Sequence, residues 1–271
     1  MSAENKRQAA IDLLAFHAEA GVDTALSEQP ANRFAESAGA AKGEGQGAPA
    51  KKPLPAYRPI AAPRAAAPLP AAGEAVGAAR AAAAQAETLD ELKSVLARFD
   101  GCALKSTAKN LVFADGNPDA RVMFVGEAPG AEEDREGLPF VGRSGKLLDR
   151  MMAAIGLDRT SAYIANIVPW RPPGNRTPTP QEAATCLPFI TRQIELADPD
   201  VLVCLGGPAA LSLLGIREGI TKARGRWFDF DTGKRSIRAL ATFHPAYLLR
   251  TPAAKRLAWR DFLALKKALS S

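Results

Sequence analysis

Three side chains with acid–base or hydrogen-bonding capacity stand near the ends of hydrophobic runs. Glu127 follows the run at 122–125, and Asn166 and His244 stand near the ends of two later runs. A carboxylate can position or deprotonate a water molecule, a side-chain amide can bind the edge of a pyrimidine, and an imidazole can donate a proton or a hydrogen bond. The sequence therefore contains three groups suited to hydrogen bonding or proton transfer near the ends of predicted strands.

Loops rich in glycine and proline accompany the first of these side chains. The segment 126–130 reads GEAPG, and the segment 137–142 reads GLPFVG just before a helical pattern. Glycines let backbone amides approach a ligand closely, and Phe140 presents an aromatic face. Neither segment is a Walker phosphate loop or a GxGxxG dinucleotide fingerprint, so the sequence indicates no nucleotide cofactor.

Each of these residues taken alone also has an ordinary structural explanation. Glu127 suits a helix-capping carboxylate, and His244 suits a hydrogen-bonded structural histidine. Phe140 suits a core aromatic, and Asn166 suits a turn cap. Their occurrence together favours the functional interpretation. His17 lies on an N-terminal helical pattern without such a context, and we assign it no role.

The elements that must position these residues alternate between strand and helix. Aliphatic and β-branched runs predict four strands, at 122–125, 163–168, 201–205 and 237–243, and the patterns between them predict helices at 146–155, 180–196 and 208–214. This alternation predicts an α/β fold, a three-layer sandwich with a central four-stranded parallel sheet flanked by helices. Ligands of such sheets bind beyond the carboxyl ends of the strands.

The chain divides into three predicted segments. Residues 1–27 contain an amphipathic helical pattern that suits docking to a protein partner. Residues 28–87 are dominated by alanine, proline and glycine, which predicts a disordered linker. Thr88 and Glu91 have the spacing of a capping box, so the folded catalytic domain is expected to occupy 88–271.

Composition places the chain among soluble globular proteins. Of its 271 residues 47% are hydrophobic, but no apolar run reaches the roughly 18 residues of a membrane span. No cleavable signal pattern is present, which predicts a cytoplasmic protein without membrane attachment. The three cysteines are too scattered for a disulfide framework. The formal net charge of +6 suits a polyanionic partner.

Three motifs resemble, in order and spacing, family 4 of the uracil-DNA glycosylase superfamily. They are GEAPG followed by PFVG at 139–142, NIVPWRPPGNR at 166–176, and FHPAYLLR at 243–250. The resemblance extends over residues 99–269. It implies a DNA repair enzyme that flips uracil out of DNA and hydrolyses the N-glycosidic bond, leaving an abasic site. The expected partner is DNA that contains uracil or another deaminated base.

The resemblance also implies how the flipped base is bound. Phe140 is expected to stack on the ring, and Asn166 is expected to bind the Watson–Crick edge. Backbone amides around Gly126 and Ala128 are expected to bind a carbonyl oxygen of the base.

Two further residues are expected to act on the bond that breaks. His244 would face the other carbonyl, where negative charge develops on the departing pyrimidine. Glu127 would position or deprotonate the attacking water, and its carboxylate would stabilise the cationic sugar.

Cations in loops after the strands are predicted to clamp DNA phosphates. Leu248 or Leu249 is predicted to wedge into the base stack. The segment 170–181 contains no histidine, unlike a superfamily branch that traps DNA covalently through one, so turnover is expected. The predicted phosphate ligands are Arg171, Arg176, Lys222, Arg224, Arg226 and Arg250.

The chain departs from family 4 at the iron–sulfur cluster that its members typically hold on four cysteines. Cys102 and Cys186 occupy two ligand positions, but Phe99 and Trp170 stand at the other two. Cys204, inside a predicted strand, is interpreted as a core residue. Two thiolates do not satisfy such a cluster, so we predict that it is absent and that aromatic packing fills its volume. No grouping of histidines and carboxylates indicates a catalytic metal.

Two alternative functions remain open from the sequence. One is a glycosylase of broader specificity that also removes hypoxanthine or xanthine, because the region around Trp170 departs from the family pattern. The other is a non-catalytic protein that binds damaged DNA or acts as a scaffold, because cluster ligands are missing. The presence of Glu127, Phe140, Asn166 and His244 favours an active enzyme over this second alternative.

Overall fold

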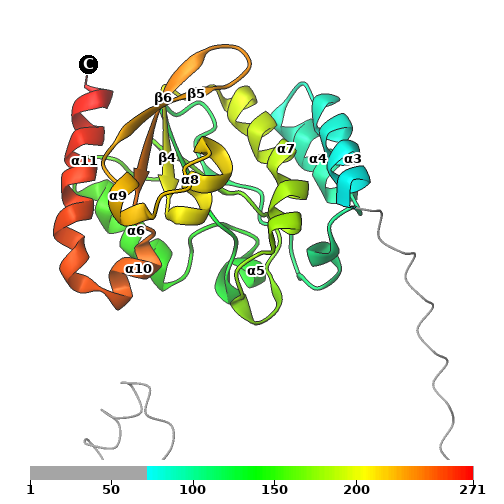
Figure 1. The fold of residues 1–271 in the computed structure, drawn as a ribbon, viewed down its shortest axis with the longest axis horizontal. Coiled ribbons are helices and arrows are strands. Elements are labelled where there is room, and N and C mark those ends of the chain that lie inside the picture. The colour runs from blue at the N-terminus through cyan, green and yellow to red at the C-terminus, as the bar shows by residue number, and fades with distance from the viewer. Residues whose placement is uncertain (1–71, 271) are drawn as a thin grey trace, which may run out of the picture. The chain divides into compact units, whose positions relative to one another are not determined.

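The computed structural model describes residues 72–270, and these residues form a mixed sheet between two helical layers (Figure 1). The sheet has six strands in the order β1-β3-β2-β4-β6-β5. Its four central strands are parallel, as predicted. They are β2 (Val122–Gly126), β3 (Tyr163–Asn166), β4 (Val201–Leu205) and β6 (Ser236–Thr242).

The prediction of a four-stranded sheet missed both edge strands. β1 (Asp115–Gly116) pairs antiparallel with β3, and β5 (Trp227–Asp231) pairs antiparallel with β6. β1 has only two residues, too few for any periodicity to show. β5 reads WFDFD and is buried only at Phe230, so its side chains lack the apolar run of the central strands. The α/β sandwich itself is confirmed.

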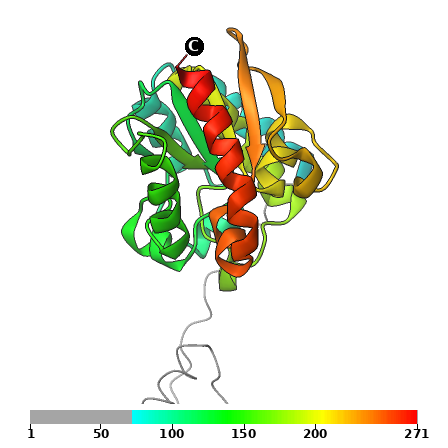
Figure 2. The same ribbon diagram turned by 90° about the vertical axis from the view of Figure 1, so that its left-hand side faces the viewer.

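Alternating side chains of the central strands supply two separate cores, one on each face of the sheet. Met123 and Val125 point into a core shared with α3 (Ala72–Ala84), α4 (Leu89–Arg98) and α7 (Pro180–Ala197). Val122 and Phe124 point into the other core. This second core includes residues of α6 (Arg143–Ala153) and α11 (Lys255–Leu269). Figure 2 shows α11 lying along its face of the sheet.

The folded region begins earlier than the sequence predicts. α3 (Ala72–Ala84) lies within the predicted linker, yet it buries Ala75, Ala79 and Ala83 and packs on α7. Its small side chains allow α3 and α7 to approach each other closely. The alanine-rich composition of the segment does not by itself reveal this packing. The capping box of Thr88 and Glu91 at the start of α4 is confirmed. The amphipathic segment 1–27 and its expected partner lie outside the described residues.

The remaining helices precede, connect or follow the strands. The predicted helices at 146–155, 180–196 and 208–214 correspond to α6, α7 and α8 (Gly207–Leu214). Among residues 72–270, no helix is both long and apolar enough to cross a membrane; the cytoplasmic location stays a prediction. The other short helices are α5 (Ala131–Glu136), α9 (Ile220–Ala223), α10 (Pro245–Arg250), η1 (Ala103–Ser106), η2 (Pro173–Asn175) and η3 (Pro252–Ala254).

Candidate active site

A cavity of about 480 Å³ lies beyond the carboxyl ends of the parallel strands. Strand register explains why the predicted residues meet there. Gly126 at the end of β2 pairs with Asn166 at the end of β3, and His244 follows β6 by two residues. The cavity is large enough for a pyrimidine ring with its sugar. Among its lining residues are Glu127, Ala128, Gly130, Glu133, Phe140, Ser144, Asn166, Thr177, His244, Tyr247 and Arg250.

Glu127 presents a carboxylate oxygen that has no partner among the described residues. Its Oε1 atom is buried and accepts no hydrogen bond. Burial raises the pKa of Glu127, and a hydrogen bond with Thr177 opposes part of that rise. A buried, unpaired oxygen beside a cavity costs free energy unless a ligand or water satisfies it. The geometry therefore provides an unsatisfied acceptor on a residue that lines the cavity.

Asn166 has a similarly unsatisfied group at the end of the neighbouring strand. The residue is only 5% exposed, and its Oδ1 atom has no hydrogen-bond partner among residues 72–270. A Cβ atom on Gly126 would lie 2.5 Å from this oxygen and 2.6 Å from Cζ of Phe140. Glycine is therefore required at position 126, where it leaves the amide and the ring their space. Gly126 supports the cavity from behind and is not one of the lining residues.

His244 is held as a neutral imidazole with a defined tautomer. It is the N-cap of α10, and its Nδ1 atom accepts a hydrogen bond from the backbone N–H of Ala246 at 3.1 Å. Burial and the nearby charge of Arg250 lower the pKa of His244 to about 4. Since Nδ1 is an acceptor, the single proton of the neutral ring resides on Nε2. His244 can therefore donate one hydrogen bond into the cavity near neutral pH.

Phe140 forms an aromatic wall beside this imidazole. Its ring centroid lies 5.5 Å from that of His244, with the ring planes at 31°. The side chain is 4% exposed, so the ring is already in place without a ligand. Its backbone has φ of 55°, the left-handed region that a phenylalanine rarely adopts.

Glu133 is a structural residue of the site that the sequence interpretation left without a role. Its Oε2 atom accepts the N–H of Gly130, and its Oε1 atom accepts the N–H of Gly142, each at 3.0 Å. The carboxylate thereby ties the GEAPG loop to the loop that contains Phe140. Its position three residues after Gly130, at the start of α5, has the spacing of a helix cap and was the available signal.

The predicted phosphate ligands differ in their exposure and in whether they form ion pairs. Arg250 and Arg176 line the cavity, and Arg176 also forms an ion pair with Glu182. Arg171 is partly buried and donates to Asn175. Lys222 is exposed on α9, and the exposed Arg226 is paired with Glu218; neither residue lines the cavity.

Two predicted DNA contacts do not agree with the structure. Arg224 is bound to the buried carboxylate of Asp261 and to the carbonyl of Leu257, so its guanidinium stabilises the packing of α11. Leu248 is 1% exposed within a small core, whereas Leu249 is 37% exposed. The periodicity of α10 turns only one of the adjacent leucines outward, which favours Leu249 as the wedge.

The two remaining cysteines, Cys102 and Cys186, belong to the same core as several aromatic side chains. The Cys186 thiol donates to the sulfur of Cys102, with a Sγ–Sγ distance of 3.8 Å, and this contact lowers the pKa of Cys102. Trp170 is buried in the same core, and the Phe99 ring contacts Phe189 with centroids 5.0 Å apart. A cluster held by four thiolates does not fit a site with two thiols and two aromatic rings at its ligand positions.

Comparison with known proteins agrees with this geometry. Residues 113–263 match the family model described as the uracil DNA glycosylase superfamily. The Type-4 uracil-DNA glycosylase of Thermotoga maritima is 45% identical over 168 residues, which cover 60% of this chain and 86% of the relative. That of Archaeoglobus fulgidus is 38% identical over 180 residues, which cover 65% of this chain and 90% of the relative.

A third relative shares the fold region within a much longer protein. A DNA polymerase of Bacillus phage SP01 is 30% identical over 155 residues, which cover 57% of this chain and 16% of the polymerase. The family match spans the central strands, the loops between them and the residues that line the cavity. The chain therefore belongs to the uracil DNA glycosylase superfamily.

Proposed function

We propose that this chain is a monofunctional uracil-DNA glycosylase of base excision repair, which hydrolyses the bond between uracil and deoxyribose. The observation that supports this most is the cavity at the strand ends, where Glu127 and Asn166 each present a buried oxygen without a partner. The similarity to Type-4 uracil-DNA glycosylases supports the same substrate. DNA is accordingly the proposed polyanionic partner.

Recognition of uracil follows from the complementarity of the cavity walls. The Oδ1 atom of Asn166 can accept from N3–H of uracil, while its amide nitrogen donates to O4. Cytosine has an acceptor at N3 and a donor at the neighbouring position, so it would leave the buried amide mismatched, which is costly. Phe140 supplies a stacking surface for the ring. The base must leave the duplex to reach these groups.

Bond cleavage uses two titratable groups of the cavity, Glu127 and His244. As the N1–C1′ bond breaks, its electron pair moves onto uracil, and negative charge accumulates on O2. The Nε2–H of the neutral His244 donates to that oxygen, and backbone amides of the loop containing Ala128 assist. The carboxylate of Glu127 stabilises the cationic sugar and orients a water molecule, whose oxygen bonds to C1′ and whose proton passes to the Glu127 carboxylate.

DNA binding is proposed to involve the cations around the cavity rim and an exposed leucine. Arg176 and Arg250 line the cavity, where they can contact phosphates on either side of a flipped nucleotide. Leu249 projects from the end of α10 and can occupy the space that the base leaves in the stack.

The function predicts abasic product from a uracil-containing oligonucleotide under single-turnover conditions. Parallel substrates with hypoxanthine, xanthine or thymine at the same position define the specificity, and cleavage of hypoxanthine or xanthine at comparable rates would establish the broader glycosylase. Wild-type protein that binds the oligonucleotides with salt dependence and cleaves none of them would instead support the non-catalytic DNA-binding protein.

We further propose that the protein functions without an iron–sulfur cluster. Protein purified under anaerobic conditions should contain substoichiometric iron and sulfide, because only Cys102 and Cys186 remain as ligands and Phe99 and Trp170 stand at the other two positions. The measurement is total iron and acid-labile sulfide per chain, together with cleavage of uracil DNA in EDTA. Stoichiometric iron and sulfide would refute this proposal, and inhibition by EDTA reversed by a divalent ion would refute the metal-free mechanism.

A further inference from the structure

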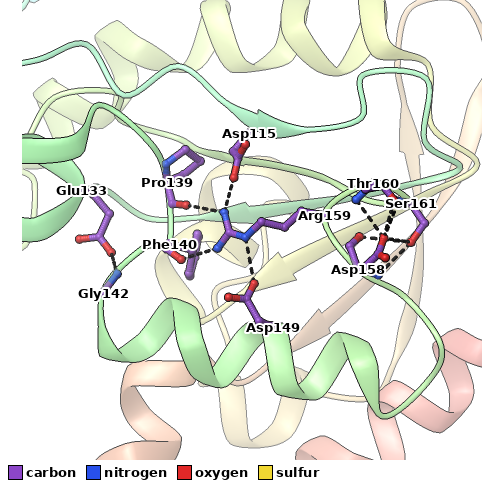
Figure 3. Close-up of polar contacts among 10 residues, drawn as sticks. All are labelled: Asp115, Glu133, Pro139, Phe140, Gly142, Asp149, Asp158, Arg159, Thr160 and Ser161. Atoms are coloured by element: carbon purple, nitrogen blue, oxygen red, sulfur yellow. Dashed lines mark hydrogen bonds and ion pairs between the residues drawn. The ribbon is translucent and has the colours of Figure 1, made fainter.

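We propose that Arg159 is a positioning residue that holds Phe140 in the conformation required for stacking on the flipped base. This inference rests on the proposed function, and it assigns a role to a residue outside the cavity. Arg159 lies in the turn between α6 and β3, and its guanidinium donates to the backbone carbonyls of Pro139 and Phe140 (Figure 3).

The conformation of Phe140 explains why its backbone needs such support. A φ of 55° is strained for a phenylalanine, and it persists only where surrounding contacts enforce it. Helix α6 approaches so closely that a Cβ on Gly145 would lie 1.6 Å from the carbonyl oxygen of Phe140. Arg159 binds that same carbonyl. Both the helix and the guanidinium therefore restrain the backbone at Phe140.

Two carboxylates hold the guanidinium in turn. Its Nε atom donates to Asp149 on α6 at 3.0 Å, and its Nη1 atom forms an ion pair with Asp115 on β1. The Arg159 side chain is only 26% exposed, so these charge-assisted bonds are partly shielded from water. We call Arg159, Asp115 and Asp149 the arginine clamp. The short edge strand β1 thus positions Asp115, one of the two carboxylates of the arginine clamp.

The turn that presents Arg159 is itself fixed by local hydrogen bonds. The carboxylate of Asp158 accepts from the backbone N–H groups of Thr160 and Ser161 and from both of their hydroxyl groups. Figure 3 shows this turn beside the clamp. The fixed turn and the fixed guanidinium leave the Pro139–Phe140 peptide little freedom. Because Arg159 does not line the cavity, its influence on the reaction must pass through Phe140.

A double-mutant cycle tests this route of action. Arg159→Met removes every donor while keeping much of the side-chain volume, and it should lower the single-turnover rate by about 10- to 100-fold, as misplacement of a substrate-contacting group does. In a Phe140→Ala background the same substitution should change the rate by less than about twofold, since there is no ring left to position. Inhibition by free uracil should weaken in Arg159→Met, while affinity for abasic DNA stays unchanged.

The control is Arg121→Met, which removes an arginine that binds one carboxylate, Asp200, and one carbonyl, Leu269, and that does not line the cavity. It should leave the rate unchanged. If Arg159→Met does not fold, Arg159→Lys, which keeps the charge with fewer donors, enters the same cycle with a smaller expected loss. Effects of Arg159 and Phe140 substitutions that simply multiply would overturn the inference, whereas an inactive wild type would overturn the proposed function instead.

Discussion

Replacing Glu127 with glutamine should slow the release of uracil from DNA by about 10²- to 10⁴-fold, the usual contribution of a positioned general base. Glutamine keeps the shape of the side chain but carries no charge, so it can neither accept a proton from water nor stabilise the cationic sugar. The measurement is the single-turnover rate of abasic-site formation with enzyme in excess. DNA affinity should change little, because Glu127 does not contribute a cation to phosphate binding.

The pH dependence of the same rate gives a second readout of Glu127. The residue acts as a carboxylate, and burial raises its pKa, so the wild-type rate should fall on acidification at a pH above the usual glutamate range near 4.3. His244 stays neutral down to about pH 4 and should add no inflection in the usual histidine range near 6.5. In Glu127→Gln the acid limb should disappear.

A neighbouring glutamate provides the control. Glu136→Gln alters an exposed residue at the end of α5 that is paired with Arg135 and does not line the cavity. It should retain both the wild-type rate and the wild-type acid limb. An acid limb that persists unchanged in Glu127→Gln would show that another group governs the ionisation, and the role assigned to Glu127 would be wrong.

The site residues that could be predicted from the sequence are those at the carboxyl ends of the central strands. The central strands are largely apolar, and β2 and β4 are buried along their whole length, so these runs are visible without a structure. Once they are parallel neighbours, the residues at their carboxyl ends must meet. Glu127, Asn166 and His244 therefore converge on one cavity, as expected, although they are more than a hundred residues apart at the extremes.

The features that could not be predicted depend on contacts between distant segments. Whether Arg224 faces DNA or a buried carboxylate depends on α11, which brings Asp261 beside it. The arginine clamp likewise joins Asp115, Asp149 and Arg159 from three separate segments, and none of them has a local motif. The helix α3 looks like linker because alanine-rich sequence gains stability only from the surface of α7 against which it packs.

Substitution of His244 is expected to have the second large effect on the rate of uracil release. Because His244 is also the N-cap of α10, the variant must keep the capping hydrogen bond. His244→Ala would remove the hydrogen-bond donor and also the Nδ1 acceptor that caps α10, a loss worth about 1 kcal/mol of stability. His244→Asn keeps an acceptor for the N–H of Ala246 but has no group that reaches the position of Nε2. The asparagine variant should therefore retain the wild-type melting temperature and lose only the donor.

The rate of uracil release in His244→Asn should fall by about 10²- to 10³-fold, as when one donor is removed from an oxyanion hole. The physical reason is that the neutral Nε2–H stabilises charge that exists only as the bond breaks, so substrate binding should be nearly unchanged. A 5-fluorouracil substrate, whose anion is intrinsically more stable, should lose less rate than uracil in this variant. Equal losses for both substrates would mean that His244 acts before the charge develops, and a wild-type rate would exclude its role as the donor.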